Sequence, residues 1–320
     1  MFNHIPVLLD EVIDGLNINK DGIYVDATIG GGGHSEKILE MISFGKGLLV
    51  GIDQDDDAIN AVSDRLKKYI DDKKLVLVKS NFENIVDALD NLNIDAIDGV
   101  LFDLGVSSFQ LDEGSRGFSY NYDATLDMRM DKDNPLTCKT LVNTFSEDDI
   151  YHIIRDYGED RFAKNIAKHI VTERSKKPIE TTFELVEVIK SAIPAKLRWG
   201  EGNEKNPAKR TFQAFRIYIN RELDVIAKAL DQVVDRVKSG GRICVITFHS
   251  LEDKLVKDKF KTFENPCTCP KGYPCVCGKK PKGRIVNKKV IVASEKELLS
   301  NRRSKPAKLR IFEKGEDSGK

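Results

Sequence analysis

Short apolar runs alternate with helical segments in the first hundred residues, and this alternation constrains the fold more than any other feature of the chain. The runs cover residues 23–25, 48–52, 75–78 and 97–102 and are rich in valine, isoleucine and leucine. Between the second and third runs, apolar residues recur at spacings of three and four, which is the period of an amphipathic helix. Strands that alternate with helices predict an α/β fold built on a mostly parallel sheet.

The middle of the chain has a different pattern. Over residues 111–206 the strand patterns disappear and amphipathic helical patterns replace them. We expect an inserted helical domain here. Residues 1–110 and 207–320 would then form one discontinuous domain around the sheet.

Beyond the insertion, the sequence predicts one long helix and further strands. The helix begins at Pro207, carries an apolar stripe over residues 212–230 and ends at the glycine pair 240–241. Three strand-like runs follow, at 243–248, 290–292 and 309–312. We expect the last two to complete the sheet as an antiparallel edge.

Composition limits the class of protein. With 40% hydrophobic residues in 320, the chain has enough apolar side chains for a core. No apolar run approaches the roughly 18 residues of a membrane-spanning helix, and the first residues lack the layout of a secretion signal. Six cysteines are too few for a disulfide scaffold. We therefore expect a globular cytoplasmic protein without disulfides.

Charge is distributed unevenly, although the formal net charge is zero. Residues 1–60 carry eleven acidic side chains and three lysines, whereas residues 266–294 hold seven basic side chains and no acidic one. An acidic region tolerates a cationic ligand, and clustered lysine and arginine are the electrostatic footprint of nucleic-acid binding. A solvated charged face is an equally common explanation for any one such run.

The glycine-rich segment Asp26-Ala27-Thr28-Ile29-Gly30-Gly31-Gly32-Gly33-His34-Ser35 joins the first strand to the first helix. Glycines there let the backbone turn sharply and approach a ligand beside the N–H groups of the helix start. The dinucleotide pattern G-x-G-x-x-G fails in every register, and the P-loop pattern is absent. The segment instead resembles the first motif of S-adenosylmethionine-dependent methyltransferases, with Thr28 in place of the first glycine.

Asp53 ends the second strand, where a carboxylate can bind both hydroxyls of a ribose. Its alternative role is an N-cap for the helix that follows, although Asp55 and Asp56 are also available for that role.

The fourth strand ends in Asp103-Leu104-Gly105-Val106-Ser107-Ser108-Phe109-Gln110, at the sheet edge where α/β proteins bind ligands. Methyltransferases that act on the amino groups of cytosine or adenine often carry an Asp/Asn-Pro-Pro-aromatic turn here. This chain matches that turn only in part. A tight turn with a purely structural role is the alternative.

Eight motifs follow one another along the chain in the order of one known family. They are His4-Ile5-Pro6-Val7-Leu8, the Gly-Gly-Gly-His loop, Asp103-Leu104-Gly105-Val106-Ser107-Ser108, Arg116-Gly117-Phe118-Ser119, Leu126-Asp127-Met128-Arg129-Met130, Arg210-Thr211-Phe212-Gln213-Ala214, Phe248-His249-Ser250-Leu251-Glu252-Asp253 and Ala307-Lys308-Leu309-Arg310. Together they resemble the bacterial small-subunit rRNA cytosine-N4 methyltransferases, the RsmH or MraW family. The resemblance implies a class I (Rossmann-like) methyltransferase with a helical insertion that recognises substrate. It also implies a cytidine in the decoding region of 16S rRNA as the substrate.

The resemblance assigns site residues as well. The implied cofactor contacts are Gly32, Gly33, His34, Asp53, Phe82, Asp103 and Gln110. In this assignment Phe82 lies against the adenine and Asp103 pairs with the methionine ammonium group of S-adenosylmethionine. The candidates that orient the cytosine amine are Asp103, Ser107 and Ser108, because that weakly nucleophilic nitrogen has to be aligned with the methyl group.

Cysteines support two further hypotheses. Cys267, Cys269, Cys275 and Cys277 supply four soft ligands on a short loop, which suits structural zinc, although free thiols are an equal alternative. Methylation of cytosine C5 through a cysteine adduct is disfavoured, because the fourth-strand turn has no cysteine. Cys244, in mid-strand, is expected to be buried and inert.

The predicted partner is small-subunit rRNA or the assembled small ribosomal subunit, and no membrane is involved. Expected backbone contacts are Arg210, Arg216, Arg221 and the basic side chains of residues 279–310. Phe118 and Tyr120 are expected to stack on an exposed base. His249 either acts as a base or packs beside a helix that Ser250 caps.

Two functions of other classes stay open on the sequence: a non-catalytic S-adenosylmethionine sensor and a nicotinamide-dependent oxidoreductase. The sequence leaves open whether the chain forms a homo-oligomer.

Overall fold

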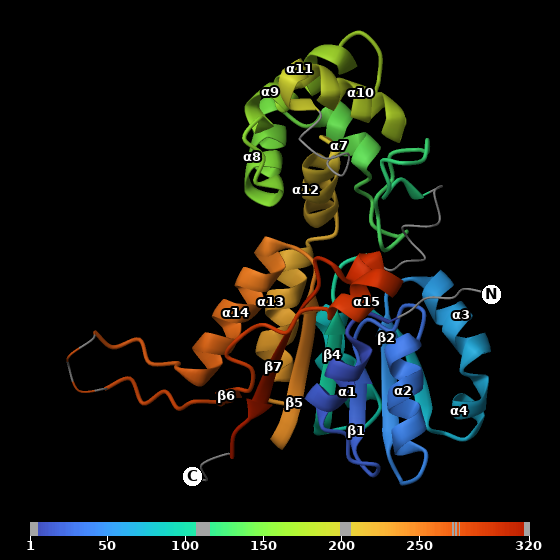
Figure 1. Ribbon diagram of the computed structural model, residues 1–320, viewed down its shortest axis with the longest axis vertical. Coiled ribbons are helices and arrows are strands. Elements are labelled where there is room, and N and C mark those ends of the chain that lie inside the picture. The colour runs from blue at the N-terminus through green and yellow to red at the C-terminus, as the bar shows by residue number, and fades with distance from the viewer. Residues whose placement is uncertain are drawn as a thin grey trace. The chain divides into compact units, whose positions relative to one another are not determined.

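The computed structural model describes residues 6–106, 116–198, 206–270, 272, 274 and 276–316. The chain divides into two compact units (Figure 1). The sheet unit is Met1–Gly105 with Leu223–Lys320, and the helical unit is Val106–Glu222. The first boundary lies five residues before the predicted one. The second lies sixteen residues after it, because the helix expected to return to the sheet belongs in part to the helical unit.

Seven strands form one sheet in the order β3-β2-β1-β4-β5-β7-β6. The strands are β1 (Ile23–Asp26), β2 (Leu48–Asp53), β3 (Leu75–Lys79), β4 (Ile97–Asp103), β5 (Val237–Thr247), β6 (Gly283–Ile285) and β7 (Lys308–Lys314). From β3 to β5 neighbouring strands are parallel, and β7 and β6 pair antiparallel at one edge. The mostly parallel α/β fold and the four early strands are confirmed.

Helices cover both faces of the sheet. The helices of this unit are α1 (Leu9–Leu16), α2 (Gly33–Ile42), α3 (Asp56–Arg65), α4 (Lys67–Asp71), η1 (Phe82–Asn84), α5 (Ile85–Asn91), α13 (Glu222–Val233), α14 (Ser250–Glu264), α15 (Glu295–Ser300) and η3 (Arg302–Ser304). Tyr24 and Leu49 share one buried cluster with α1, α2 and α3, whereas Val25 and Val50 share another with α5, α13 and α14. Burial on both faces explains why the strands are continuous apolar runs.

The helical unit has a buried core of its own. Its helices are α7 (Cys138–Thr144), α8 (Glu147–Gly158), α9 (Ala163–Arg174), α10 (Thr182–Ala192), α11 (Ala195–Arg198) and α12 (Lys209–Ile219). Ser146 and Thr181 begin α8 and α10, each in a capping box with the acidic residue three positions later. These local signals start helices at defined residues, and apolar stripes then pack the helices together.

The single helix predicted after Pro207 is instead two helices, α12 and α13. Arg221 lies between them with a φ of 50°, in the left-handed region that helices do not adopt. The side chain of Asn220 accepts the N–H of Met130 and donates to the carbonyl of Met128, which anchors the break. A tertiary contact therefore interrupts a stripe that is continuous in sequence.

Two other predictions for the second half of the chain are wrong. The glycines at 240–241 lie inside β5, where the pairing of β5 with β4 shifts register, and they do not end a helix. The run at 290–292 contributes only an isolated bridge between Ile291 and Leu309, and the edge strand β6 precedes it. Three apolar residues are too few to form a stable strand pair with β7, because β7 already has β6 as its partner on the same side.

Candidate functional site

The carboxyl ends of β2, β1 and β4 lie side by side at one edge of the sheet. This edge is where open α/β sheets bind their ligands. The glycine loop, Asp53 and Asp103 follow or end these three strands. The sheet therefore brings together residues that are far apart in the sequence.

Glycine is required at three of the four positions of the loop, Gly30, Gly32 and Gly33. Gly30 and Gly32 have φ values of 48° and 74°, which disfavour any side chain. A Cβ at Gly33 would lie 2.4 Å from Cγ of Pro6, whereas a Cβ at Gly31 would meet no described atom within 4 Å. Gly31 thus borders open space in which a ligand can approach the main chain.

Two short polar side chains, which the sequence did not single out as site residues, hold this loop in place. Ser35 donates to Oδ2 of the buried Asp26 at 2.6 Å. Oγ1 of Thr28 accepts the N–H of Asp103 at 2.7 Å, so it fixes the end of β4 to the loop after β1. The sequence does contain a hint of the role of Thr28, because this residue replaces the first glycine of the motif. A hydroxyl group at that position is expected to have a hydrogen-bond partner nearby.

Asp53 binds the loop and leaves helix capping to its neighbour. Its two oxygens accept the N–H groups of Gly30 at 3.0 Å and of Asp55 at 2.9 Å. Asp55 caps α3 by accepting the N–H of Asp57. Burial raises the pKa of Asp53 to about 6. The N-cap alternative for Asp53 is therefore wrong.

Asp103 carries an incompletely satisfied carboxylate. Its Oδ1 is buried and accepts no hydrogen bond from the described residues. Burial, reinforced by the nearby charges of Asp26 and Glu252, raises the pKa of Asp103 to about 8. A carboxyl group in this state gains most from a cation, because the cation restores the charge and supplies the missing donor.

The His34 ring is buried beneath this carboxylate. Nε2 lies 2.9 Å from the carbonyl oxygen of Val7, and Nδ1 lies 3.6 Å from Oδ2 of Asp103. The carbonyl can only accept, so Nε2 carries a proton and Nδ1 of the neutral ring presents a lone pair to Asp103. The contact between Nδ1 of His34 and Oδ2 of Asp103 is favourable only when one of the two groups, the Asp103 carboxyl or Nδ1, carries a proton. The side chain of His34 thus supports Asp103, and a direct ligand contact would fall to its backbone.

Phe82 lies in the one-turn helix η1 that follows β3. Its ring packs edge-on against Phe102 of β4, with ring centroids 5.7 Å apart, and it stays partly exposed. An aromatic ring held from one side in this way can stack with another planar group. The other predicted site residues at this edge, Ser107, Ser108 and Gln110, lie outside the described residues.

The residues present suit an adenosyl cofactor with a cationic amino acid end. The unpartnered oxygen of Asp103 can accept from an ammonium group, and Asp53 retains lone pairs for hydroxyl groups. The open space at Gly31 lets a ligand lie along the loop. A pyrophosphate ligand would need cationic or amide donors at the loop. The arrangement described here does not require such a ligand.

His249, rather than Ser250, is the N-cap of α14. His249 and Glu252 form the capping box, and the carboxylate of Glu252 accepts the N–H groups of Phe248 and His249. Glu252 is fully buried. The imidazole therefore has a structural partner, which favours the packing role over that of a base.

The cysteines divide by environment. Cys138 and Cys244 are buried, as was predicted for Cys244, and burial raises the pKa of the Cys244 thiol to about 12, which disfavours the reactive thiolate. The Sγ atoms of Cys267, Cys269 and Cys277 all lie within 4.8 Å of one another. Cys275 lies outside the described residues.

Several of the predicted RNA contacts have partners within their own unit. Arg216 forms a two-pronged ion pair with Glu222, and Arg210 donates to the carbonyl of Glu159. Phe118 is only 7% exposed, which rules out the predicted role of an exposed stacking platform. Tyr120 is partly buried against Phe212.

Among the described helices, none is long and apolar enough to cross a bilayer.

Comparison with known proteins gives strong matches over nearly the full length. The model of the MraW methylase family matches residues 1–315. A protein of Lachnospira eligens named ribosomal RNA small subunit methyltransferase H is 57% identical over 314 residues, or 98% of each chain. One of the same name from Clostridium botulinum is 52% identical, over 98% of this chain and 99% of its own. Among solved structures, an rRNA methylase from Streptococcus thermophilus aligns over 96% of this chain and 94% of its own, with a TM-score of 0.41 and 12% identity.

Proposed function

Because this chain belongs to the MraW methylase family, we propose that it methylates the N4 amine of a cytidine in the decoding region of 16S rRNA, with S-adenosylmethionine as methyl donor. The substrate rests on the relatives, which are named for methylation of small-subunit rRNA. The choice of S-adenosylmethionine as the methyl source depends on one observation above all: beside the glycine loop, the buried Oδ1 of Asp103 receives no hydrogen bond from the residues that the structure describes. Small-subunit rRNA, free or assembled, is then the partner, and it is met in the cytoplasm.

Each cofactor contact has a physical reason in this proposal. Asp103 holds the ammonium group, and Asp53 accepts from the ribose hydroxyls while it keeps the loop in place. Phe82 lies against the adenine ring. Gly32, Gly33 and the backbone of His34 line the methionine end, and Gln110 adds a polar contact.

Catalysis in this proposal consists mainly of positioning. S-adenosylmethionine supplies an activated methyl group on a good leaving group. The cytosine nitrogen forms the new N–C bond as the S–C bond breaks, and the amine then loses one proton to an acceptor or to water. Asp103 is engaged with the ammonium group, so Ser107, Ser108 or nearby carbonyl groups orient the amine.

Methyl transfer to undermethylated small subunits, followed by mass spectrometry of the nucleosides, tests the proposal. We expect N4-methylcytidine. C5-methylcytidine, or tight cofactor binding without any transfer, would refute it in favour of the cysteine mechanism or of a sensor. Calorimetric titration with NAD tests the oxidoreductase alternative, because tight NAD binding without S-adenosylmethionine binding would support that class.

We also propose a structural zinc site in the loop after α14. The three thiols within 4.8 Å of one another support it, since tetrahedral zinc with Zn–S bonds of about 2.3 Å places its ligands about 3.8 Å apart. Sγ of Cys269 accepts the N–H of Val276 at 3.4 Å, the kind of outer hydrogen bond that stabilises a thiolate ligand. Cys275 is the fourth ligand in this proposal.

Metal analysis of the purified protein tests this site. We expect one zinc per chain in the wild type, loss of zinc in Cys267→Ser/Cys277→Ser, and retention in the control Thr268→Ser. Methyl transfer should survive loss of the metal. A wild-type protein that binds no zinc from a zinc-supplemented buffer would show that the thiols are free.

A further inference from the structure

The basic residues of the sheet unit differ in whether they have an acidic partner. Lys308 and Arg310 share Asp253, Lys282 binds Asp235, and both Arg242 and Arg284 bind Glu313. Each of these side chains is therefore held by a carboxylate within the fold. In contrast, Lys257, Lys261 and Lys288 are exposed and form no ion pair with any described acid.

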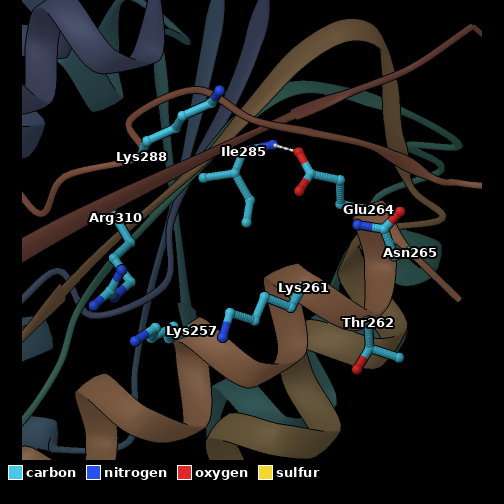
Figure 2. A pocket seen from close by; sticks show the side chains of 8 residues that line it. All are labelled: Lys257, Lys261, Thr262, Glu264, Asn265, Ile285, Lys288 and Arg310. Carbon is cyan, nitrogen blue, oxygen red and sulfur yellow. Dashed lines mark hydrogen bonds between the residues drawn. The ribbon is translucent and has the colours of Figure 1, made fainter.

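These three lysines converge on one pocket. The pocket has a volume of about 560 Å³ and lies between the end of α14, strand β6 and strand β7. Figure 2 shows Lys257 and Lys261 on one side, Lys288 and Arg310 on another, and Ile285 between them. Glu264 is the acidic residue of the lining, and its Oε1 accepts the N–H of Ile285 at 2.9 Å. The pocket therefore has an excess of positive charge.

Two of the three lysines lie on one face of α14, near its C-terminal end. Lys257 and Lys261 are four residues apart on α14, so they lie on the same face, where like charges repel. The pocket lies at the C-terminal end of α14, where the helix dipole is negative and favours cations such as Lys261, so an anion here would be bound by lysine side chains and not by the helix end. A tight site for a small phosphate normally uses the opposite end of a helix, with its N–H groups. Mobile lysines at this end suit a phosphate chain, which is bound by charge and without fixed geometry.

The length of α14 is compatible with a phosphate chain that reaches both the sheet edge near Asp103 and the pocket. The N-cap of α14, His249, follows β5 at the same sheet edge as Asp103. The helix has fifteen residues, which is about 22 Å at 1.5 Å per residue. A nucleic acid strand that enters the methyl-transfer edge can thus continue to the pocket.

We propose that this pocket binds phosphodiester groups of the substrate RNA, flanking the nucleotide that is methylated. The inference rests on the proposed function for its choice of RNA. The sequence-based expectation covered the basic side chains of residues 279–310. Within that range Lys288 lines the pocket, whereas Lys282 is held by both oxygens of Asp235, and the pocket adds Lys257 and Lys261. Asn265 and Thr262 supply polar groups at the rim, and Ile285 offers an apolar surface for a ribose.

The test compares two triple variants of the full chain. The first is Lys257→Gln/Lys261→Gln/Lys288→Gln. The control is Lys20→Gln/Lys46→Gln/Lys73→Gln, which removes three exposed lysines at the amino ends of β1, β2 and β3. Binding of a fluorescent 16S rRNA fragment is measured over a range of salt concentrations. Each lost phosphate contact lowers the slope of log affinity against log salt by about 0.7 to 0.9.

We expect the slope of log affinity against log salt to be smaller by about 2 in the pocket variant. Its RNA affinity should be about tenfold weaker at 0.15 M salt, while the control matches the wild type. Its KM for RNA should rise with little change in kcat, and calorimetric titration with S-adenosylmethionine should be unchanged. An unaltered salt slope in the pocket variant would overturn the proposal. So would saturable binding of inorganic phosphate that depends on the three lysines without any effect on RNA, because the pocket would then serve a small anion.

The same experiment separates this inference from the proposed function. A wild-type protein that methylates small subunits, with a pocket variant of unchanged RNA affinity, refutes only the pocket. A wild-type protein that binds RNA through the three lysines but transfers no methyl group refutes only the function.

Discussion

The sheet unit contains two charged regions that are built in opposite ways. At the carboxyl ends of β1, β2 and β4, the carboxylate of Asp103 is surrounded by fixed groups, and its buried Oδ1 receives no hydrogen bond from the described residues. At the β6–β7 edge, three exposed lysines surround an open pocket and form no ion pair within the described part of the chain. Burial makes a single charge expensive and hence selective for one ligand group, whereas exposed charges act by number and are screened by salt. The first region suits a small cofactor and the second a polyanion.

The largest effect is expected for Asp103→Asn. Removing one partner of a buried, hydrogen-bonded charge pair should weaken S-adenosylmethionine binding by about 100-fold or more and abolish methyl transfer. Asp98→Asn, at the other end of β4, is the matched control and should bind normally.

Stability gives a second measure of Asp103→Asn. The folded pKa of about 8 lies above the ordinary value of 3.8, so the unfolded chain holds fewer protons between these pH values, and stability falls as pH rises through this window. Removing the ionisable group should therefore raise the melting temperature of the cofactor-free protein, most clearly at pH 8 and above. A variant with normal binding, or with lowered stability at that pH, would contradict the account of Asp103.

A smaller loss of affinity is expected for Asp53→Ala. Two hydroxyl hydrogen bonds to a charged acceptor predict about 10- to 100-fold weaker cofactor binding. Asp55→Ala is the control, since it removes the cap of α3 and should cost about 1 kcal/mol of stability while cofactor affinity stays within a few fold. Equal affinity losses in both variants would mean that Asp53 acts only by shaping the loop.

The pH dependence of cofactor binding should distinguish the two regions. An ammonium group needs the Asp103 carboxylate, so below pH 8 binding has to release a proton, and affinity should rise as the pH is raised from 6 towards 8. Calorimetry in buffers of different ionisation enthalpy measures this proton release. RNA binding by the lysine pocket should not follow the same profile, and a shared profile would link the two regions.

The smallest effect is expected for the single variant Lys288→Gln. Loss of one phosphate contact should lower the salt slope by about 0.7 to 0.9 and weaken RNA binding a few fold near physiological salt. Asp103→Asn should leave that slope unchanged. A change of slope in the Asp103 variant would mean that the cofactor edge and the pocket bind RNA as one surface.

Local sequence patterns predicted which helices and strands are present better than they predicted the residues at which these begin and end. The runs at 23–25, 48–52, 75–78 and 97–102 became strands, because residues buried on both faces must be apolar whatever their neighbours are. The stripe over 212–230 gave no sign of its break, since the cause is the bond from Asn220 to a loop about ninety residues earlier in the chain. His249 in place of Ser250 as N-cap is a shift of one residue, which pattern alone does not resolve.

The sequence by itself determined the parallel sheet, the glycine loop and the presence of Asp53 and Asp103 at strand ends, because these depend on residue type and on spacing within short segments. Only the tertiary structure decided that Asp55 caps the helix while Asp53 binds the loop. It also decided that, among the described residues, none donates to the buried oxygen of Asp103, and which lysines have an acidic partner there. Those outcomes depend on which side chains from distant segments come within about 4 Å of one another. Such distances are set by the packing of the whole fold.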